Sequence, residues 1–428
     1  MEKLSWLSSK EGADVRTIIT HFWDTLSTKA YPVTKGTMRV PISLEPFTLS
    51  REEYENLNKN LLLVISAARK LAEHYFTDQD LQTIFSLNAA EVGLIEASKD
   101  EPFVGIVRAD LFYGAQPKLV ELNTDFPDGF FMHDVTAQTI QDLLPAHYET
   151  NSNAALFQRL LESAGVSKQD HIFIGYDKGR KFIDEFALTQ RTLEGQGWKR
   201  VSYGAIEDLE YRDGVFYWND EPVQVIRRGV ETSKMRANTE LLANITRAQR
   251  DSGLKVINNF KMRLLGHKSL LAALWDTRFE KYMSDEELGA VKSLVPETLK
   301  LETAGLEKIS IEKDGWVLKP SDLTEGEGVV IGSACSATEW SASIEEALKN
   351  PRAWLLQRKA DIPKDTFSLF NAETGETHSS EMSYDLDPHI VLFRDHAEMG
   401  NMLVRFSPSE ILNVMKGGGL TYAFVGVE

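Results

Sequence analysis

The residues best suited to chemistry lie in the segment EPFVGIVRADLFYGAQPKLVELNTD, where two short alternating runs flank a turn containing Gly and Pro. This pattern predicts a β-hairpin. Because side chains alternate along a strand, Arg108 and Asp110 share one face of the first arm. Glu121 and Asn123 share one face of the second arm for the same reason. If Arg108 pairs opposite Glu121, all four side chains point the same way, with Asp110 diagonal to Glu121.

These four side chains suit a metal ion that carries phosphate. Two carboxylates and an amide oxygen are ligands for Mg2+, which keeps waters and phosphate oxygens as its other ligands. Arg108 would supply a planar cation for a phosphate beside the metal. The pattern also fits a solvated strand face with a cross-strand ion pair, so the hairpin alone leaves both interpretations open.

More acids follow the second arm of the hairpin. Asp125 and Asp128 belong to Thr124–Gly129, a loop at a strand end, where functional residues are often found. They are candidates to hold a substrate's ammonium group or to accept its proton. Simple solubility of the loop explains them equally well.

A glycine-rich loop occurs between two predicted strands, Trp316–Lys319 and Val329–Ile331. Gly326 and Gly328 would let the backbone approach a ligand, and exposed N–H groups there could bind phosphate. A strand follows the glycines, which excludes a Rossmann fingerprint, and the chain has no P-loop. It also lacks the HRD and DFG triplets of a protein kinase.

Two lysines lie beside apolar runs. Taken singly, Lys268 and Lys319 fit solvated surface residues, but beside a strand–loop–strand unit they are candidates to clamp nucleotide phosphates. Gln357 ends the strand-like run WLLQ and would present a polar group to adenine.

In combination, R-x-D, E-x-N-x-D-x-P, K-S-L-L-A and W-V-L-K-P followed by a glycine loop resemble the circularly permuted ATP-grasp ligases. That group includes glutathionylspermidine synthase-like enzymes and stand-alone peptide ligases of natural-product pathways. The resemblance runs from about residue 104 to the C-terminus. It implies a mixed fold (α+β or α/β), an ATP-grasp fold in permuted order, because the metal-binding hairpin precedes the nucleotide lysines.

The resemblance also implies domains and residue roles. The expected units are a mainly helical N-terminal region at 1–100, the metal-binding hairpin part of the ATP-grasp core at 101–150, an α/β pre-ATP-grasp-like domain at 151–260, a nucleotide-binding lid at 261–360 and the closing part of the core at 361–428. The implied roles are Mg2+ ligands for Asp110, Glu121 and Asn123, γ-phosphate binding for Arg108, nucleotide binding for Lys268 and Lys319, phosphate cover for Gly326 and Gly328, and contact with the acyl-phosphate or acid for Arg405. The tail around Asn413 and Val414 is similar to the family's closing segment.

The activity that the resemblance implies is ATP-dependent ligation of a carboxylate to an amine, through an acyl-phosphate, with ATP and Mg2+ as cofactors. Amino-acid or small peptide-like substrates in a biosynthetic pathway are expected. Two alternatives stay open: acyl transfer onto a carrier-protein thiol, and an inactive nucleotide-binding scaffold. A carrier protein and a second copy of the chain are further candidate partners.

Composition limits the partners. The 428 residues include 47 Lys and Arg against 64 Asp and Glu, a net charge of -17, which argues against a broad nucleic-acid surface. Cys335 is the only cysteine, so neither a disulfide nor a cysteine-based zinc site is expected. No apolar run approaches the ~20 residues that span a bilayer, and the start lacks a signal-peptide layout. We therefore expect a cytoplasmic protein without membrane partners.

The nine histidines contain no HExxH pair. His389 and His396 stand among acids in the segment 385–396, a composition that suits a metal site. A polar loop explains the same composition and is the favoured interpretation.

Overall fold

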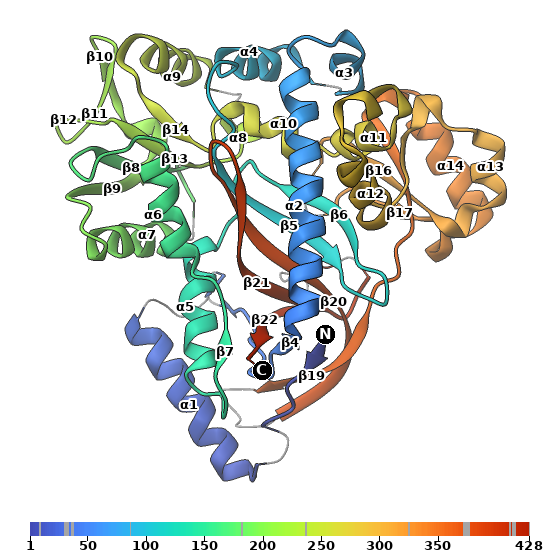
Figure 1. The fold of residues 1–428 in the computed structure, drawn as a ribbon, viewed down its shortest axis with the longest axis horizontal. Helices are drawn as coiled ribbons and strands as arrows, with labels where there is room; N and C mark the ends of the chain where they lie inside the picture. Colours follow the sequence, from blue (N-terminus) through green and yellow to red (C-terminus); the bar gives the residue numbers. More distant parts are fainter. Residues whose placement is uncertain are drawn as a thin grey trace.

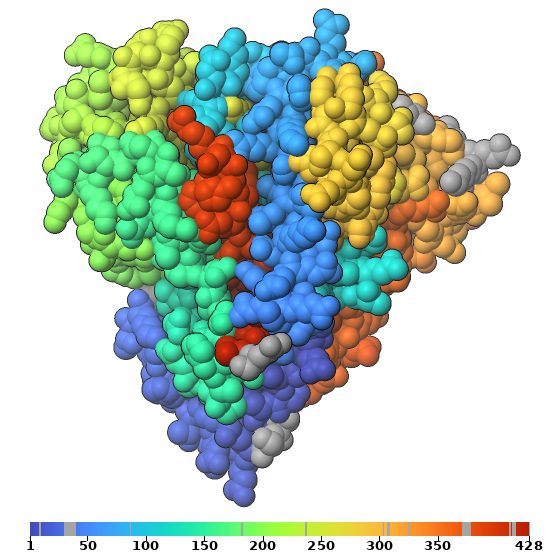
Figure 2. All heavy atoms as spheres, viewed as in Figure 1, coloured from blue at the N-terminus to red at the C-terminus, as the bar shows by residue number. Residues whose placement is uncertain are grey.

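The structure is a computed structural model of the chain, and Figures 1 and 2 show it from one side. Asn413 and Val414 lie outside the residues that it describes. Across the described residues, no helix combines the length and apolar character needed to cross a membrane. The description covers residues 1–428 apart from 8–9, 30–33, 36–37, 86, 181–182, 236–237, 324–325, 371–376, 411, 413–416 and 428.

The largest sheet has nine strands, in the order β1-β4-β22-β21-β20-β5-β6, with β19 paired to β20 and β7 to β22 (Figure 1). The 16-residue strand β20 pairs with β21 on one side and with β19 and then β5 on the other. These strands are β1 (Glu2–Lys3), β4 (Phe47–Leu49), β5 (Gly105–Phe112), β6 (Lys118–Asn123), β7 (Tyr148–Glu149), β19 (Lys364–Phe370), β20 (Thr377–Leu392), β21 (Ala397–Ser407) and β22 (Gly419–Gly426).

The long helix α2 (Arg51–His74) lies across this sheet (Figure 1). It begins with a capping box formed by Ser50 and Glu53. Leu61 and Val64 of α2 belong to one apolar cluster with Val107 of β5. Because alternate residues of β5 face α2, the side chains between them must face the opposite side of the sheet. That side is where the candidate site lies.

The opposite side of the sheet is partly covered by α1 (Gly12–Lys29) and α5 (Phe130–Gln141). Phe22 of α1 and Ile140 of α5 form an apolar cluster with Leu403 of β21. Besides α1 and α2, the first hundred residues contribute β1 and β4 to the large sheet. The remaining elements of this region are β2 (Thr34–Lys35), β3 (Met38–Arg39), α3 (Gln79–Ile84) and α4 (Ala89–Ala97).

A second sheet has four parallel strands in the order β14-β13-β8-β9. A three-stranded sheet adjoins it along the chain, and its Asp213-Gly214 turn joins β10 to β11. Figure 2 shows this part, in green, on the far side of α2 from the yellow and orange residues near 300. The elements are α6 (Asn153–Ser163), β8 (His171–Tyr176), α7 (Asp184–Gly195), β9 (Arg200–Ala205), β10 (Glu210–Arg212), β11 (Val215–Trp218), β12 (Glu221–Pro222), β13 (Val225–Gly229), α8 (Thr232–Met235), α9 (Thr239–Ser252) and β14 (Lys255–Ile257).

Another sheet, called the lid sheet below, has four antiparallel strands in the order β15-β18-β16-β17. It contains both predicted strands around the glycine loop. Trp316, Trp340 and Leu356 form its buried core with α14. The elements are α10 (Arg263–Gly266), α11 (Ser269–Trp275), α12 (Asp285–Leu294), β15 (Thr298–Lys300), α13 (Leu306–Ile311), β16 (Trp316–Pro320), β17 (Val330–Ile331), α14 (Ala337–Ala347) and β18 (Trp354–Arg358).

The β5–β6 hairpin forms as predicted, but in a different register. Arg108 lies opposite Asn123, and Asp110 lies directly opposite Glu121, so the assumed pairing of Arg108 with Glu121 is wrong. The observed register is thus shifted relative to the assumed one, and the one-residue irregularity between Asp110 and Leu111 lies after these pairs and is not its cause. The shift is two residues, which preserves the face on which each side chain points. The four polar side chains therefore still share one face.

Candidate functional site

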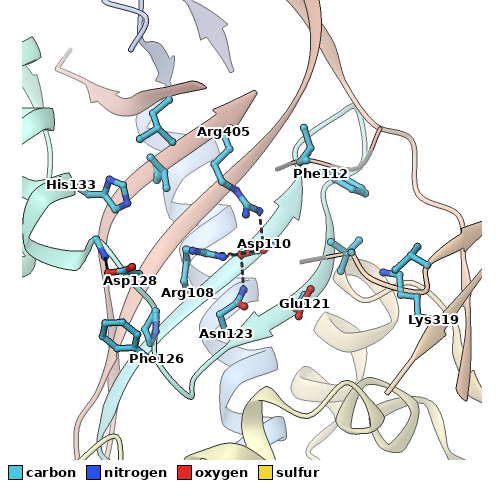
Figure 3. A pocket seen from close by; sticks show the side chains of 18 of the residues that line it. Arg108, Asp110, Phe112, Glu121, Asn123, Phe126, Asp128, His133, Lys319 and Arg405 are labelled. Atoms are coloured by element: carbon cyan, nitrogen blue, oxygen red, sulfur yellow. Dashed lines mark hydrogen bonds and ion pairs between the residues drawn. The ribbon is translucent and has the colours of Figure 1, made fainter. Parts of the chain in front are cut away.

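A cavity of about 730 Å³ lies between the large sheet and the lid sheet. Arg108 and Asp110 line it from the large sheet, whereas Lys319 and Ile331 line it from the lid sheet. Figure 3 shows Lys319 on one side of this pocket and His133 on the other, with the hairpin residues between them. The volume is in the range of pockets that hold small molecules and cofactors.

Asp110 stands at the centre of the polar cluster, and three side chains bind it (Figure 3). Arg108 Nε donates to its Oδ1 at 3.0 Å, and Asn123 Nδ2 donates to the same oxygen at 2.9 Å. Arg405 Nη2 donates to Oδ2 at 2.8 Å. Burial opposes ionisation of Asp110, but the charges of Arg108 and Arg405 outweigh it and lower its pKa. The structure therefore brings three predicted residues, Arg108, Asn123 and Arg405, together around the buried carboxylate of a fourth, Asp110.

Asp385 and Asp387 of β20 belong to the same cluster, although the sequence analysis gave them no role. Arg405 Nη2 lies 2.5 Å from Asp385 Oδ2, and Arg405 also pairs with Asp387. One carboxylate oxygen each from Asp110, Asp385 and Asp387 lies within 4.8 Å of the others. Burial raises the pKa of Asp385 to about 6 and that of Asp387 well above its ordinary value, against the pull of Arg405. In the sequence, the spacing of Asp385 and Asp387 on one strand was the signal that could have identified these two residues as part of the site.

The oxygen-rich donor set of this cluster fits a hard divalent cation such as Mg2+. Glu121, one of the predicted ligands, lies opposite Asp110 but accepts a hydrogen bond from Lys268 Nζ at 2.7 Å. Asn123 donates to Asp110 through its amide nitrogen. Asp110 thus belongs to two candidate sets of oxygen ligands, the predicted set on the hairpin and the carboxylates of β20.

Of the two predicted nucleotide lysines, Lys319 lines the cavity, whereas Lys268 contacts Glu121, which lines it. Lys268, which immediately precedes α11, binds Glu121 and also donates to the carbonyl oxygen of Leu323 at 2.7 Å. Lys319 Nζ donates to Gln357 Oε1 at 2.7 Å. Burial lowers the pKa of Lys319 to about 8, partly offset by the charge of Glu121. Phosphate oxygens near Lys319 would stabilise its charged form.

Gln357 lines the cavity, but both ends of its amide have partners within the lid sheet. Its Oε1 accepts from Lys319, and its Nε2 donates to Thr298 Oγ1 at 3.1 Å. The geometry therefore assigns Gln357 first to holding Lys319 in place, and contact with adenine would require its amide to change partners.

The glycine loop contributes Gly326 to the cavity lining, whereas Gly328 packs beside Pro320. Both glycines have a left-handed backbone, with φ of 75° and 71°. Thr324 and Glu325, between β16 and the glycines, lie outside the described residues.

The two acids predicted to contact a substrate have different positions. Asp125 does not line the cavity: its Oδ1 lies 2.5 Å from Arg228 Nη1, and its Oδ2 accepts from the Thr232 backbone at 2.7 Å. The prediction for Asp125 is corrected, because Arg228 and Thr232 occupy its carboxylate. Asp128 does line the cavity, where Arg180 Nη2 lies 2.6 Å from its Oδ2.

His389 and His396 do not share a metal site. His389 is buried and hydrogen-bonds Asn401 at 3.0 Å through Nδ1. The half-exposed ring of His396 pairs with Asp395 and Glu398. The favoured interpretation of His396 as a polar turn residue agrees with these contacts.

No protein-family model matches the chain, and no curated protein matches its sequence. Among solved structures, the chain is similar to a glutathione synthetase-like effector from Globodera pallida, with a TM-score of 0.69, 10% identity and 98% of each chain covered. This likeness shows a shared fold. A putative gamma-glutamylcysteine synthetase from Methylobacillus flagellatus matches with a TM-score of 0.39, 12% identity and 83% and 85% coverage of this chain and its own. That likeness is too remote to support an argument.

Proposed function

We propose that this chain is an ATP-dependent carboxylate–amine ligase with an ATP-grasp fold in circularly permuted order. It would activate an acid as an acyl-phosphate and join it to an amine, releasing ADP and phosphate. One observation carries the proposal: a hairpin bearing Arg108, Asp110 and Glu121 faces the lid-sheet residue Lys319 across a single cavity. The fold shared with a glutathione synthetase-like protein supports it.

The lining of the cavity suits both the base and the phosphates of a nucleotide. Val317 and Ile331 of the lid sheet line it and offer apolar surface for a base. Lys319 and Arg108 offer cations for the phosphates. Along the chain, the hairpin at 105–123 precedes the lysines at 268 and 319, and this order supports the permuted arrangement.

Asp110, with Glu121 and Asn123 or with Asp385 and Asp387, would hold Mg2+. When bound, Mg2+ would neutralise phosphate charge and orient the transferring group. Glu121 and Asp110 would give up their contacts with Lys268 and Arg405, freeing both cations for phosphate oxygens.

In the reaction, an oxygen of the substrate carboxylate attacks the γ-phosphorus, and the bond from that phosphorus to the bridging oxygen breaks. Charge on the transferring oxygens would be stabilised by Arg108, Arg405 and Lys319, which are already fixed by buried partners. The amine then attacks the acyl carbon and phosphate leaves. The glycine loop around Gly326 would limit access of water to the acyl-phosphate.

The test is Mg2+-dependent ADP release from ATP with amino acids as acids and a panel of amines. Release that requires both an acid and an amine supports the ligase. ATP binding without release for any pair favours the inactive scaffold. Release that requires a carrier-protein thiol, seen as an acylated carrier by mass spectrometry, favours the thiol-transfer alternative.

Glu121→Ala examines the hairpin within the same assay. We expect it to abolish ADP release while changing the thermal unfolding of the nucleotide-free protein little, because Glu121 is partly exposed. Full activity of the Glu121→Ala protein would contradict the proposed role of the hairpin in the reaction.

A further inference from the structure

Three polar side chains lie on one face of the lid sheet, on the adjacent strands β15, β18 and β16. Gln357 lies directly opposite both Thr298 and Val317. Lys319 is two residues beyond Val317, so its side chain points to the same face. Lys319 and Gln357 line the cavity, whereas Thr298 is only 1% exposed and does not line it. This face therefore connects a buried side chain of β15 with a lysine at the cavity wall.

The directions of the hydrogen bonds on this face follow from the hydrogens that each group carries. Thr298 Oγ1 lies 2.8 Å from the carbonyl oxygen of Pro296, which can only accept, so the single hydroxyl hydrogen is used there. Gln357 must therefore donate from Nε2 to Thr298 Oγ1 at 3.1 Å. At the other end of the amide, Lys319 Nζ can only donate, and it does so to Gln357 Oε1 at 2.7 Å. Both contacts require the same orientation of the Gln357 amide.

Lys319 keeps donors for a ligand. Among the residues that the structure describes, Gln357 Oε1 is the one hydrogen-bond partner of its Nζ. A lysine ammonium group has three donors on a flexible four-carbon stem. The amide therefore fixes Nζ at the cavity wall before a ligand arrives, which lowers the entropy cost of binding. The two remaining donors suit neighbouring oxygens of a phosphate chain.

We propose that Gln357 and Thr298 are positioning residues, which hold Lys319 for the nucleotide phosphates, and that Gln357 acts on the nucleotide through Lys319 rather than by contact with the base. The inference rests on the proposed function, because it takes ATP as the ligand of this cavity. Thr298 gives the sharpest distinction: its buried hydroxyl does not line the cavity, so it affects ATP only through Gln357 and Lys319.

The first experiment measures how firmly Lys319 is held and needs no nucleotide. In protein labelled with ¹³C-lysine, the Cε signal of Lys319 is assigned by its loss in Lys319→Arg. At pH 7, below the value of about 8 to which burial lowers the pKa of Lys319, NMR relaxation should show a rigid Cε in the wild-type protein and a mobile one in Gln357→Met.

The matched pair at position 298 tests the outer end of the chain by the same measurement. Thr298→Val keeps the shape of the side chain but removes the hydroxyl, and it should make the Cε of Lys319 more mobile. Thr298→Ser keeps the hydroxyl and should restore the wild-type order. A Cε that is equally ordered in Gln357→Met and the wild-type protein, or a mobile one in the wild-type protein, would overturn the inference.

The second experiment is a double-mutant cycle on ATP affinity. Gln357→Met should weaken ATP binding about tenfold and Thr298→Val about threefold, with most of the affinity recovered in Thr298→Ser. In a Lys319→Met background, Gln357→Met should cause no further loss, because the lysine that it positions is gone. The same loss in both backgrounds would show that Gln357 contacts the nucleotide itself and would overturn the inference, as would an unchanged affinity of Gln357→Met.

The two experiments also separate this inference from the proposed function. A wild-type protein that does not bind ATP would reject the proposed function, and the mobility of Lys319 would then decide whether Gln357 and Thr298 position it. ATP binding without any coupling between Gln357 and Lys319 would reject the positioning role alone.

Discussion

At the scale of single residues, the site depends on charges that are buried together. Arg405 contacts Asp110, Asp385 and Asp387, all of which are buried. A buried ion pair adds little net stability, but removing one partner leaves the other charges without compensation. Arg405 should therefore matter for stability as well as for the proposed chemistry.

Arg405→Leu should lower the free energy of unfolding by roughly 3–5 kcal/mol at pH 8, where the exposed carboxylates of the unfolded chain are fully ionised. The matched control is Arg159→Ala, which removes a half-exposed ion pair with Glu398 and should cost about 1 kcal/mol or less. Urea denaturation measures both. Equal small losses of unfolding free energy in the two variants would show that Arg405 is not required to compensate the buried carboxylates.

Glu185 should give the protein a specific pH dependence. Burial, partly offset by Arg227, raises its pKa from the ordinary 4.5 to about 7. Between these values the folded state holds a proton that the unfolded chain has released, so the free energy of unfolding falls as the pH rises. Glu185→Gln should reduce this fall by roughly 3 kcal/mol across the interval. Denaturation curves at pH 4.5 and 7 test it, and equal pH dependence in both proteins would contradict the raised pKa.

The residues that could be predicted from the sequence are those whose positions local rules determine. Arg108 and Asp110 share a face because strand alternation requires it, and a register error of two residues left that conclusion intact. Asp125 was misjudged because its partner Arg228 lies 103 residues away in sequence. A loop acid facing a cavity and one bound to a buried arginine look alike in sequence.

At the scale of elements, β20 explains what the sequence could not show. Asp385 lies opposite Arg405 on β21, and Leu386 lies opposite Leu111 on β5. The second pairing joins segments more than 250 residues apart, and no local pattern specifies it. The β5–β6 hairpin and the β16–β17 pair around the glycine loop, in contrast, form between neighbouring segments and were predicted.

The lid sheet offers a test confined to one element. A Cβ at Gly332, directly after β17, would lie 1.9 Å from the carbonyl oxygen of Lys313, so Gly332→Ala must displace backbone. We expect ATP affinity to fall about tenfold or more, since the displaced segment adjoins β16 and its Lys319. Gly289→Ala is the control: α12 has open space there, and the change should stabilise its helix by up to about 1 kcal/mol. Calorimetric titration with ATP measures the affinities. An unchanged ATP affinity of Gly332→Ala would contradict a role of the lid sheet in nucleotide binding.

At the scale of the whole molecule, three sheets contribute different residues to the candidate site. The large sheet carries the buried charges, the lid sheet faces it across the cavity, and the parallel sheet contributes through α7 and its preceding loop, which bring Glu185 and Arg180 to the cavity. The mixed helix-and-strand character was expected from the resemblance to the ATP-grasp ligases, and the sheets and helices of the structure confirm it. The inclusion of β1 and β4 in the large sheet was not, because strands of two and three residues carry no periodicity.

The central claim is that a substrate carboxylate is phosphorylated in this cavity. The most direct measurement supplies ATP, Mg2+, hydroxylamine and the twenty amino acids labelled with ¹⁸O in their carboxylates, and analyses the released phosphate by mass spectrometry. An acyl-phosphate pathway transfers one ¹⁸O from the acid to phosphate, and we predict this label together with an amino-acid hydroxamate. ADP formation with only unlabelled phosphate, or no ADP from protein that binds ATP, would contradict the ligase assignment.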